Sequence, residues 1–274
     1  MNELFKRAIT GFIYIFLLLS AIMLDASAFD FLFLSFGIIC LFEFKRLVRL
    51  KGLSVFIIFL FVWWLFIHLK VSVFSVYIFL LFTILANVYL TLLLFYGKTP
   101  LRLRDNRYKL LISLLYIGGG CVFIPLIYKK ECDVVYSQFD AQLTMIGILC
   151  IIWASDSFAY LTGKSFGKHK LFERISPKKT IEGFVGGLVG ATITSSIIAF
   201  YSSRETWEWI VLAVVLVVTG TIGDLVESSF KRVANVKDSG TILPGHGGLL
   251  DRLDSLVFAS PFAYLVLQIL DYFN

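Results

Sequence analysis

The chain has 274 residues, of which 58% are hydrophobic and only 16% charged, with a formal net charge of +6 and a mean hydropathy of +0.86. A soluble domain is ordinarily about half apolar and about a quarter charged. The sequence also contains repeated apolar runs of about 20 residues, the length that spans a lipid bilayer. These features exclude a soluble α-helical domain and predict an all-α, polytopic integral membrane protein.

Nine apolar segments alternate with polar connections and are predicted to cross the membrane. The predicted spans are 8–24, 28–44, 53–69, 72–96, 108–128, 141–163, 183–201, 207–227 and 255–272. The first is favoured as a retained anchor over a signal peptide, because its apolar run is long for a signal sequence. We expect two regions: residues 1–140 hold the first five spans, and residues 141–274 form a catalytic region with four spans and two polar loops.

Lysines and arginines are distributed unequally between the two sides of the predicted bundle. The N-terminus and the even-numbered connections hold 21 of the 25 basic residues, while the other side keeps Lys70, Lys129, Lys130 and Arg204. Since basic loops remain in the cytoplasm, this pattern predicts that the N-terminus and the even-numbered connections are cytoplasmic. The basic residues in 45–51 and 98–109 are interpreted as contacts with anionic lipid headgroups, worth about 1 kcal/mol each.

Several acidic residues lie where a membrane disfavours them. Asp156 falls inside the sixth span, and Asp224 and Glu227 fall near the end of the eighth. An acid at a helix centre costs about 2.5–3.5 kcal/mol, so it usually faces a polar cavity and marks a site. Asp251 and Asp254 open the ninth span. Because the eighth and ninth spans can lie antiparallel, we expect Asp224 to approach Asp251; for Asp254 a helix-capping role is the alternative.

Clustered carboxylates repel one another unless a cation joins them. Hard oxygen ligands without cysteine or a histidine pair favour Mg²⁺. The predicted metal-binding residues are Asp156, Asp224, Glu227, Asp251 and Asp254. The four cysteines have no metal-binding spacing and are interpreted as small buried apolar side chains.

Two polar loops, 164–182 and 228–254, carry basic residues suited to phosphate groups. The segment Ser176–Thr180 is predicted to begin a helix, whose N-terminus would concentrate backbone donors and positive potential. The predicted phosphate-binding residues are Lys164, Lys168, Ser176, Lys178, Lys179, Thr180, Lys237 and Arg252; a solvated basic turn is the alternative for the first loop. His246 lies between glycines and is interpreted as a proton carrier or a phosphate donor, with a structural role as the alternative.

These loops closely resemble the phosphatidate cytidylyltransferase (CDP-diacylglycerol synthase) family. The resemblance is carried by Ser228, Lys231-Arg232, Lys237-Asp238, Pro244-Gly245-His246-Gly247-Gly248 and Asp251-Arg252-Leu253-Asp254. The preceding stretch also fits, through Trp153, Asp156, Ala159-Tyr160, Gly163, Gly167-Lys168, Ser176-Pro177-Lys178-Lys179-Thr180 and Glu182-Gly183. The resemblance is specific over residues 150–256 and rests on hydropathy before them.

The resemblance implies an enzyme of phospholipid biosynthesis that makes CDP-diacylglycerol and pyrophosphate from CTP and phosphatidate. It implies a homodimeric integral-membrane enzyme. With the orientation predicted from the basic residues, we expect it in the inner (cytoplasmic) membrane, its active site facing the cytoplasm, in contact with membrane lipid and without a nucleic-acid partner. The resemblance also implies Mg²⁺ with a monovalent cation such as K⁺ beside it, and Asp224 and Asp251 match the positions that hold the cations. The predicted catalytic residues are Asp224, Asp251, Lys231, Arg232 and His246.

Two other classes of function remain open. A CTP-dependent lipid kinase of the dolichol or phytol kinase type would share the membrane topology and the acid-rich loops, but it releases CDP instead of pyrophosphate. A cation-coupled transporter would use Asp156 and Asp224 as coupling sites. The long polar loops between spans argue against the transporter.

Overall fold

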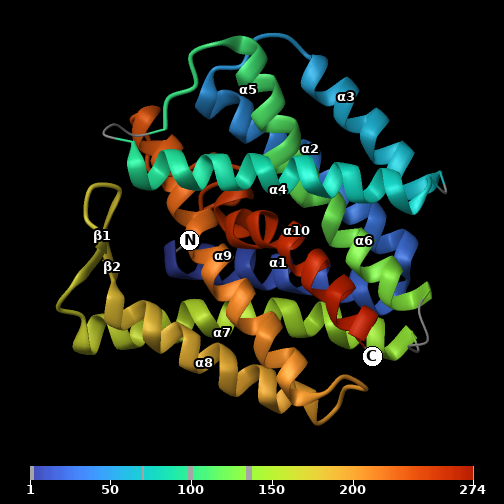
Figure 1. The fold of residues 1–274 in the computed structure, drawn as a ribbon. Helices are drawn as coiled ribbons and strands as arrows, with labels where there is room; N and C mark the ends of the chain where they lie inside the picture. The colour runs from blue at the N-terminus through green and yellow to red at the C-terminus, as the bar shows by residue number, and fades with distance from the viewer. Residues whose placement is uncertain (1–2, 70, 98–100, 134–137, 274) are drawn as a thin grey trace.

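The structure is a computed structural model that describes residues 3–69, 71–97, 101–133 and 138–273. Its helices are α1 (Glu3–Leu24), α2 (Ala26–Val48), α3 (Ser54–Trp63), α4 (Val73–Tyr96), α5 (Asn106–Ile112), α6 (Gly120–Asp133), α7 (Gln138–Phe166), α8 (Ile181–Ala199), α9 (Thr206–Val233) and α10 (Leu250–Phe273), with π-helical turns η1 (Trp64–His68) and η2 (Ser113–Gly119). Figure 1 shows them packed as one bundle, with the chain ends at opposite sides. Lys70 and Lys98 lie outside the described residues.

The prediction of a helical, multi-pass membrane protein is confirmed. Each predicted span coincides with a helical segment, since in lipid every backbone group must find its partner within the segment. Seven helical segments within the described ranges are long and apolar enough to cross a membrane, and Ala8–Leu24 and Ser54–His68 are shorter apolar helices. The fifth predicted span is composite, because α5, η2 and α6 follow one another without a break.

Glycines loosen this fifth span. Gly118 and Gly119 lie in the π-helical turn η2, where the regular α-helical hydrogen-bond ladder is interrupted. A Cβ atom on Gly119 would lie 2.7 Å from Oγ1 of Thr83 in α4. The missing side chain therefore allows α4 to pack closely against this span.

In the described part of the chain, one small antiparallel hairpin departs from the all-α architecture. It consists of β1 (Lys170–Phe172) and β2 (Ser176–Thr180), and it projects from one end of the bundle in Figure 1. The prediction that Ser176–Thr180 begins a helix is wrong. Pro177 disfavours helical geometry at the residue before it, and Thr180 is an extended N-cap whose Oγ1 accepts a hydrogen bond from Gly183 N at 3.1 Å. Helix α8 therefore starts only at Ile181.

Helices α7 and α8 lie side by side along their length (Figure 1). The glycines of α8 face α7, and a Cβ on Gly187 would lie 2.9 Å from the carbonyl oxygen of Ser155. These glycines are packing residues, because a missing side chain lets two helices approach closely. The close approach joins the hairpin, which leads into α8, to the part of α7 that carries Asp156.

A buried ionic cluster holds the opposite end of the bundle together. Arg204 is 5% exposed, and its Nη2 lies 2.8 Å from Oε1 of Glu131 while its Nη1 lies 2.8 Å from Oδ1 of Asp271 and 3.6 Å from Oε2 of Glu208. Burial opposes the charged guanidinium, but the carboxylates of Glu131 and Asp271 outweigh it and raise the pKa of Arg204 above its ordinary value. The cluster joins the ends of α6, α9 and α10, and Lys130 also contacts Asp271.

Replacing this arginine is expected to destabilise the bundle without altering its chemistry. Arg204→Met removes the guanidinium that contacts the buried carboxylates of Glu131 and Glu208 and the carboxylate of Asp271, so we expect the free energy of unfolding to fall by about 3–5 kcal/mol. Thermal unfolding of the purified protein measures the loss. Arg107→Met, an exposed residue at the other end, is the control and should change stability by less than about 0.5 kcal/mol. Equal destabilisation by both variants would contradict a role for the cluster.

Candidate active site

Polar side chains converge at the end of the bundle that carries the hairpin. A cavity of about 240 Å³ opens there between α1, α7, α10 and the loop before α10. Its polar lining comprises Thr10, Tyr14, Trp153, Asp156, His246, Asp251, Arg252, Asp254 and Ser255. Three acids that the sequence predicts as metal ligands therefore share one cavity with two predicted catalytic or phosphate-binding residues.

Lys231 connects the acids of α9 and α10. Its Nζ lies 2.5 Å from Oε2 of Glu227, one helical turn earlier in α9, and 2.7 Å from Oδ1 of Asp251 in the first turn of α10. Glu227 is fully buried and Lys231 is 8% exposed. The two helices thus meet through one ammonium group flanked by two carboxylates.

Asp224 has a different cationic partner. Its Oδ2 lies 2.5 Å from Nζ of Lys179 in β2, and its Oδ1 accepts a hydrogen bond from Oγ of Ser228 at 3.1 Å. The negative charge of Asp224 also lies close enough to Asp254 and Asp156 to repel theirs. The hairpin therefore delivers a lysine to the acid of α9, and Asp224 and Asp251 each pair with a separate ammonium group.

The loop before α10 wraps around the carboxylate of Asp251. Its Oδ2 accepts hydrogen bonds from N and Oγ of Ser239, at 2.8 and 2.9 Å, and from Gly248 N at 2.8 Å. Gly247 has φ of +90°, and a Cβ there would lie 2.8 Å from the same Oδ2. Glycine is required at this position both for its backbone conformation and for the close approach.

Glu43 of α2 supports the site and is not among the residues predicted from the sequence. It is 1% exposed; its Oε1 accepts a hydrogen bond from Leu249 N at 3.2 Å, and its Oε2 accepts from Leu250 N at 2.8 Å and from Ser239 Oγ at 3.2 Å. It thereby caps the start of α10 from a distant part of the chain. The available signal was an acid inside the apolar segment 40–44.

Removing this cap is expected to weaken both stability and activity. Glu43→Ala leaves the buried backbone donors of Leu249 and Leu250 without an acceptor, each costing about 1–3 kcal/mol, and removes one of the two acceptors of Ser239 Oγ in the loop that surrounds Asp251. We expect a lower unfolding midpoint and at least a tenfold loss of turnover per folded molecule, measured by thermal unfolding and product formation. Glu173→Ala, on the exposed hairpin turn, is the control. Wild-type turnover in Glu43→Ala would show that Glu43 does not position the site.

Some of the other predicted residues make structural contacts, and the rest are exposed lysines. Arg232 Nε donates to Ile175 O at 3.3 Å and so ties α9 to the hairpin, and Arg252 Nη2 donates to His246 O at 2.9 Å beside the cavity. Ser176 and Thr180 have the structural positions described above. The exposed lysines, which do not line the acidic cavity, are Lys164, Lys168, Lys178 and Lys237.

The donor atoms of the site suit a hard cation. Oε1 of Glu227 is buried and has no hydrogen-bond partner among the described residues. Carboxylate oxygens are the ligands that Mg²⁺ prefers. In the described part of the chain no group of three or more His, Cys, Asp or Glu side chains is arranged around a metal position, and the acids instead face Lys179 and Lys231.

The fold and the site together define a multi-pass membrane protein that carries, at one end of the bundle, an acid-lined cavity and ion pairs between carboxylates and the ammonium groups of Lys179 and Lys231. The profile described as "Cytidylyltransferase family" matches residues 5–270, and the chain belongs to this family. It is 33% identical to the phosphatidate cytidylyltransferase of Bacillus subtilis (strain 168), over 98% of this chain and 99% of the relative. The phosphatidate cytidylyltransferases of Staphylococcus aureus (strain COL) and Staphylococcus haemolyticus (strain JCSC1435) are 44% and 42% identical, each over 57% of both chains.

Proposed function

We propose that this protein transfers CMP from CTP to phosphatidate, giving CDP-diacylglycerol and pyrophosphate. The observation that carries the proposal is the similarity to the Bacillus subtilis phosphatidate cytidylyltransferase along nearly the whole chain. The acid-lined cavity at the end of the membrane bundle supports it, because this reaction joins a membrane lipid to a soluble nucleotide. We further propose that residues 141–274 supply most of the site, with support from α1 and α2.

In the proposed reaction a phosphate oxygen of phosphatidate attacks the α-phosphorus of CTP. A new P–O bond forms as the bond from the α-phosphorus to the bridging oxygen breaks, and pyrophosphate leaves with the electron pair. The nucleophile is already an anion, so no strong base is required. The obstacle is the repulsion between two polyanions, which cationic side chains reduce.

Lys179 and Lys231 are the cations closest to the acids. Their contacts with Asp224, Glu227 and Asp251 hold the two ammonium groups in place. We propose that they orient phosphate oxygens, with Arg252 and His246 at the cavity wall. Arg232 supports the hairpin that carries Lys179.

We infer that Asp224 and Asp251 hold Mg²⁺, with Asp156, Glu227 and Asp254 as further ligands or as supports of the ligands. The unpartnered Oε1 of Glu227 and the all-oxygen donor set support this inference. When bound, Mg²⁺ offsets the charge of the triphosphate and of the leaving pyrophosphate. We propose a monovalent cation such as K⁺ as a second ion of the same site.

We place the site on the cytoplasmic side of the cytoplasmic membrane and propose a homodimer. The distribution of lysine and arginine supports the orientation, and the homodimer rests on the family resemblance. An apolar cavity of about 590 Å³ between α1, α2 and the loop before α10 adjoins the acid-lined cavity, since both are lined by Thr10, Tyr14 and Leu243. Its apolar lining suits the acyl chains of phosphatidate.

The proposal is tested with purified protein and phosphatidate in mixed micelles, to which CTP, dCTP, ATP or GTP is added in turn. We expect pyrophosphate release with CTP and none with ATP or GTP. Chelation of the divalent ion should abolish turnover, and added Mg²⁺ should restore it. Release of CDP would identify a lipid kinase, and substrate flux in sealed vesicles without CTP would identify a transporter. Either result would overturn the proposal.

A further inference from the structure

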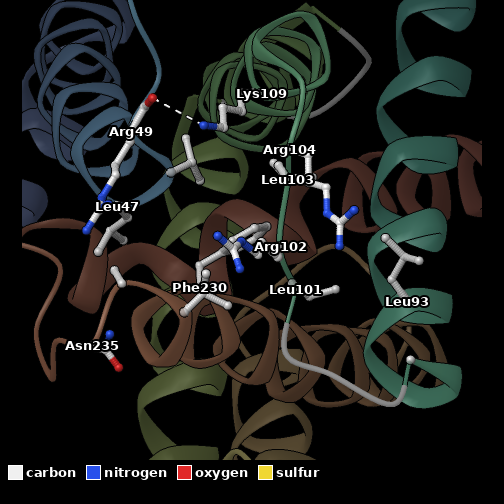
Figure 2. Close-up of a pocket in the computed structure, with 14 residues that line it drawn as sticks. Leu47, Arg49, Leu93, Leu101, Arg102, Leu103, Arg104, Lys109, Phe230 and Asn235 are labelled. Carbon is white, nitrogen blue, oxygen red and sulfur yellow. Dashed lines mark hydrogen bonds between the residues drawn. The ribbon is translucent and has the colours of Figure 1, made fainter.

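A second and larger cavity lies at the ends of α2, α4 and α9, beside the start of α5. Its volume is about 1140 Å³, and it shares no lining residue with the acid-lined cavity. Figure 2 shows Arg49 from the end of α2, Arg102 and Arg104 from the segment before α5, and Lys109 from α5 around it. The proposed reaction uses none of these residues.

The charged side chains that line this cavity are basic. Four basic side chains line it, and none of the described lining residues is acidic. The hydrogen bonds and ion pairs found in the described ranges do not involve the side chains of Arg49, Arg102 or Arg104. Lys109 Nζ donates to the carbonyl oxygen of Arg49 at 3.3 Å, which joins two sides of the cavity (Figure 2). The guanidinium groups therefore remain available to an anionic ligand.

The segment that carries two of these arginines is fixed to the bundle. Leu101 is 3% exposed, and its backbone N donates to Oγ of Ser229 in α9 at 2.9 Å. Leu101 and Leu103 turn toward the core, while the alternating residues Arg102 and Arg104 are exposed to the cavity. This alternation, typical of extended backbone, turns both arginine side chains away from the core, and Figure 2 shows them reaching to opposite sides of the segment.

Apart from Asn235, the other side chains of the lining are apolar. They include Leu47, Leu93, Phe230 and Val233, which come from the ends of three long membrane helices. The cavity therefore lies where a membrane-spanning helix leaves the hydrocarbon region. A ligand that fits it carries an anionic group for the arginines and tolerates apolar surroundings.

We propose that this cavity binds a phosphate group of a ligand other than the reacting substrates. Arginine binds phosphate oxygens with two parallel hydrogen bonds, and a cavity whose charged lining residues are all basic favours a phosphate ester bearing one or two negative charges. The phosphate belongs either to the headgroup of an anionic membrane phospholipid or to a soluble polyphosphate. Both share the chemistry that the cavity recognises.

Native mass spectrometry of the detergent-purified full chain distinguishes these sources, with dioleoyl phosphatidylglycerol and inorganic pyrophosphate as separate probes. The test variant is Arg102→Gln/Arg104→Gln. The matched control, Arg46→Gln/Arg107→Gln, removes the same charge from two exposed arginines at the same end that do not line the cavity. No CTP is present, and pyrophosphate bound at the proposed active site contributes equally in both variants, so the comparison between them does not depend on the proposed function.

We expect the apparent Kd of one probe to rise about tenfold or more in the test variant and less than about twofold in the control. Loss of phosphatidylglycerol binding assigns the cavity to a lipid headgroup, and loss of pyrophosphate binding assigns it to a soluble polyphosphate. Equal losses in both double variants would reduce the effect to net charge and overturn the proposal. Unchanged binding of both probes by the test variant would overturn it as well. Unfolding midpoints close to wild type verify that both variants fold.

Discussion

Asp224→Asn is expected to lower CTP-dependent turnover by about 100- to 1000-fold while the protein remains folded. The amide still accepts a hydrogen bond from Ser228, so the end of α9 keeps its local structure. The substitution removes the negative charge that pairs with Lys179 at 2.5 Å. We propose that the same charge binds the divalent ion. Pyrophosphate release at saturating CTP, together with thermal unfolding, measures both effects.

Glu173→Gln is the matched control, because it makes the same chemical change on the exposed turn of the hairpin that carries Lys179. It should retain turnover within about twofold of wild type. The dependence of Asp224→Asn on Mg²⁺ concentration adds a second measurement, since loss of a ligand should raise the concentration needed for half-maximal rate. Near-normal turnover in Asp224→Asn would remove Asp224 from the metal site.

Lys231→Met is expected to impair both folding and catalysis. The substitution leaves Glu227 and Asp251 without the ammonium group that lies 2.5 and 2.7 Å from them. Uncompensated buried carboxylates cost about 3–5 kcal/mol, so the free energy of unfolding should fall by that amount. Turnover should fall by at least about 100-fold, because a cation proposed to orient phosphate oxygens is lost. Thermal unfolding and pyrophosphate release, normalised to folded protein, separate the two effects.

A second substitution distinguishes the structural role of this lysine from its chemical role. Glu227→Gln in the Lys231→Met background removes the fully buried negative charge, so part of the lost stability should return. Turnover should not return with it, because the double variant still lacks the ammonium group. Recovery of turnover together with stability would show that Lys231 acts only by holding α9 and α10 together.

The sequence by itself determined the architecture and the family. Backbone groups in lipid must bond within their own segment, so apolar length predicts helices, and the helix positions follow from hydropathy alone. The motif from Ser228 to Asp254 also predicts the family to which the chain belongs. Local signals failed at Ser176–Thr180, where the sequence resembles the first turn of a helix. In the structure Thr180 is the extended residue that caps α8, so the residues before it lie outside the helix and form a strand.

Only the tertiary structure decided how the site is held. Glu43 meets Leu249 and Leu250 across more than 200 residues of chain, a contact that no local spacing encodes. The pairing of Lys179 with Asp224 likewise depends on how the hairpin packs against α9. Hydropathy indicates whether a segment lies in lipid or in water, and residue spacing indicates which side chains share a helix face. The partner of a buried charge depends instead on which distant segments the packed bundle brings beside it.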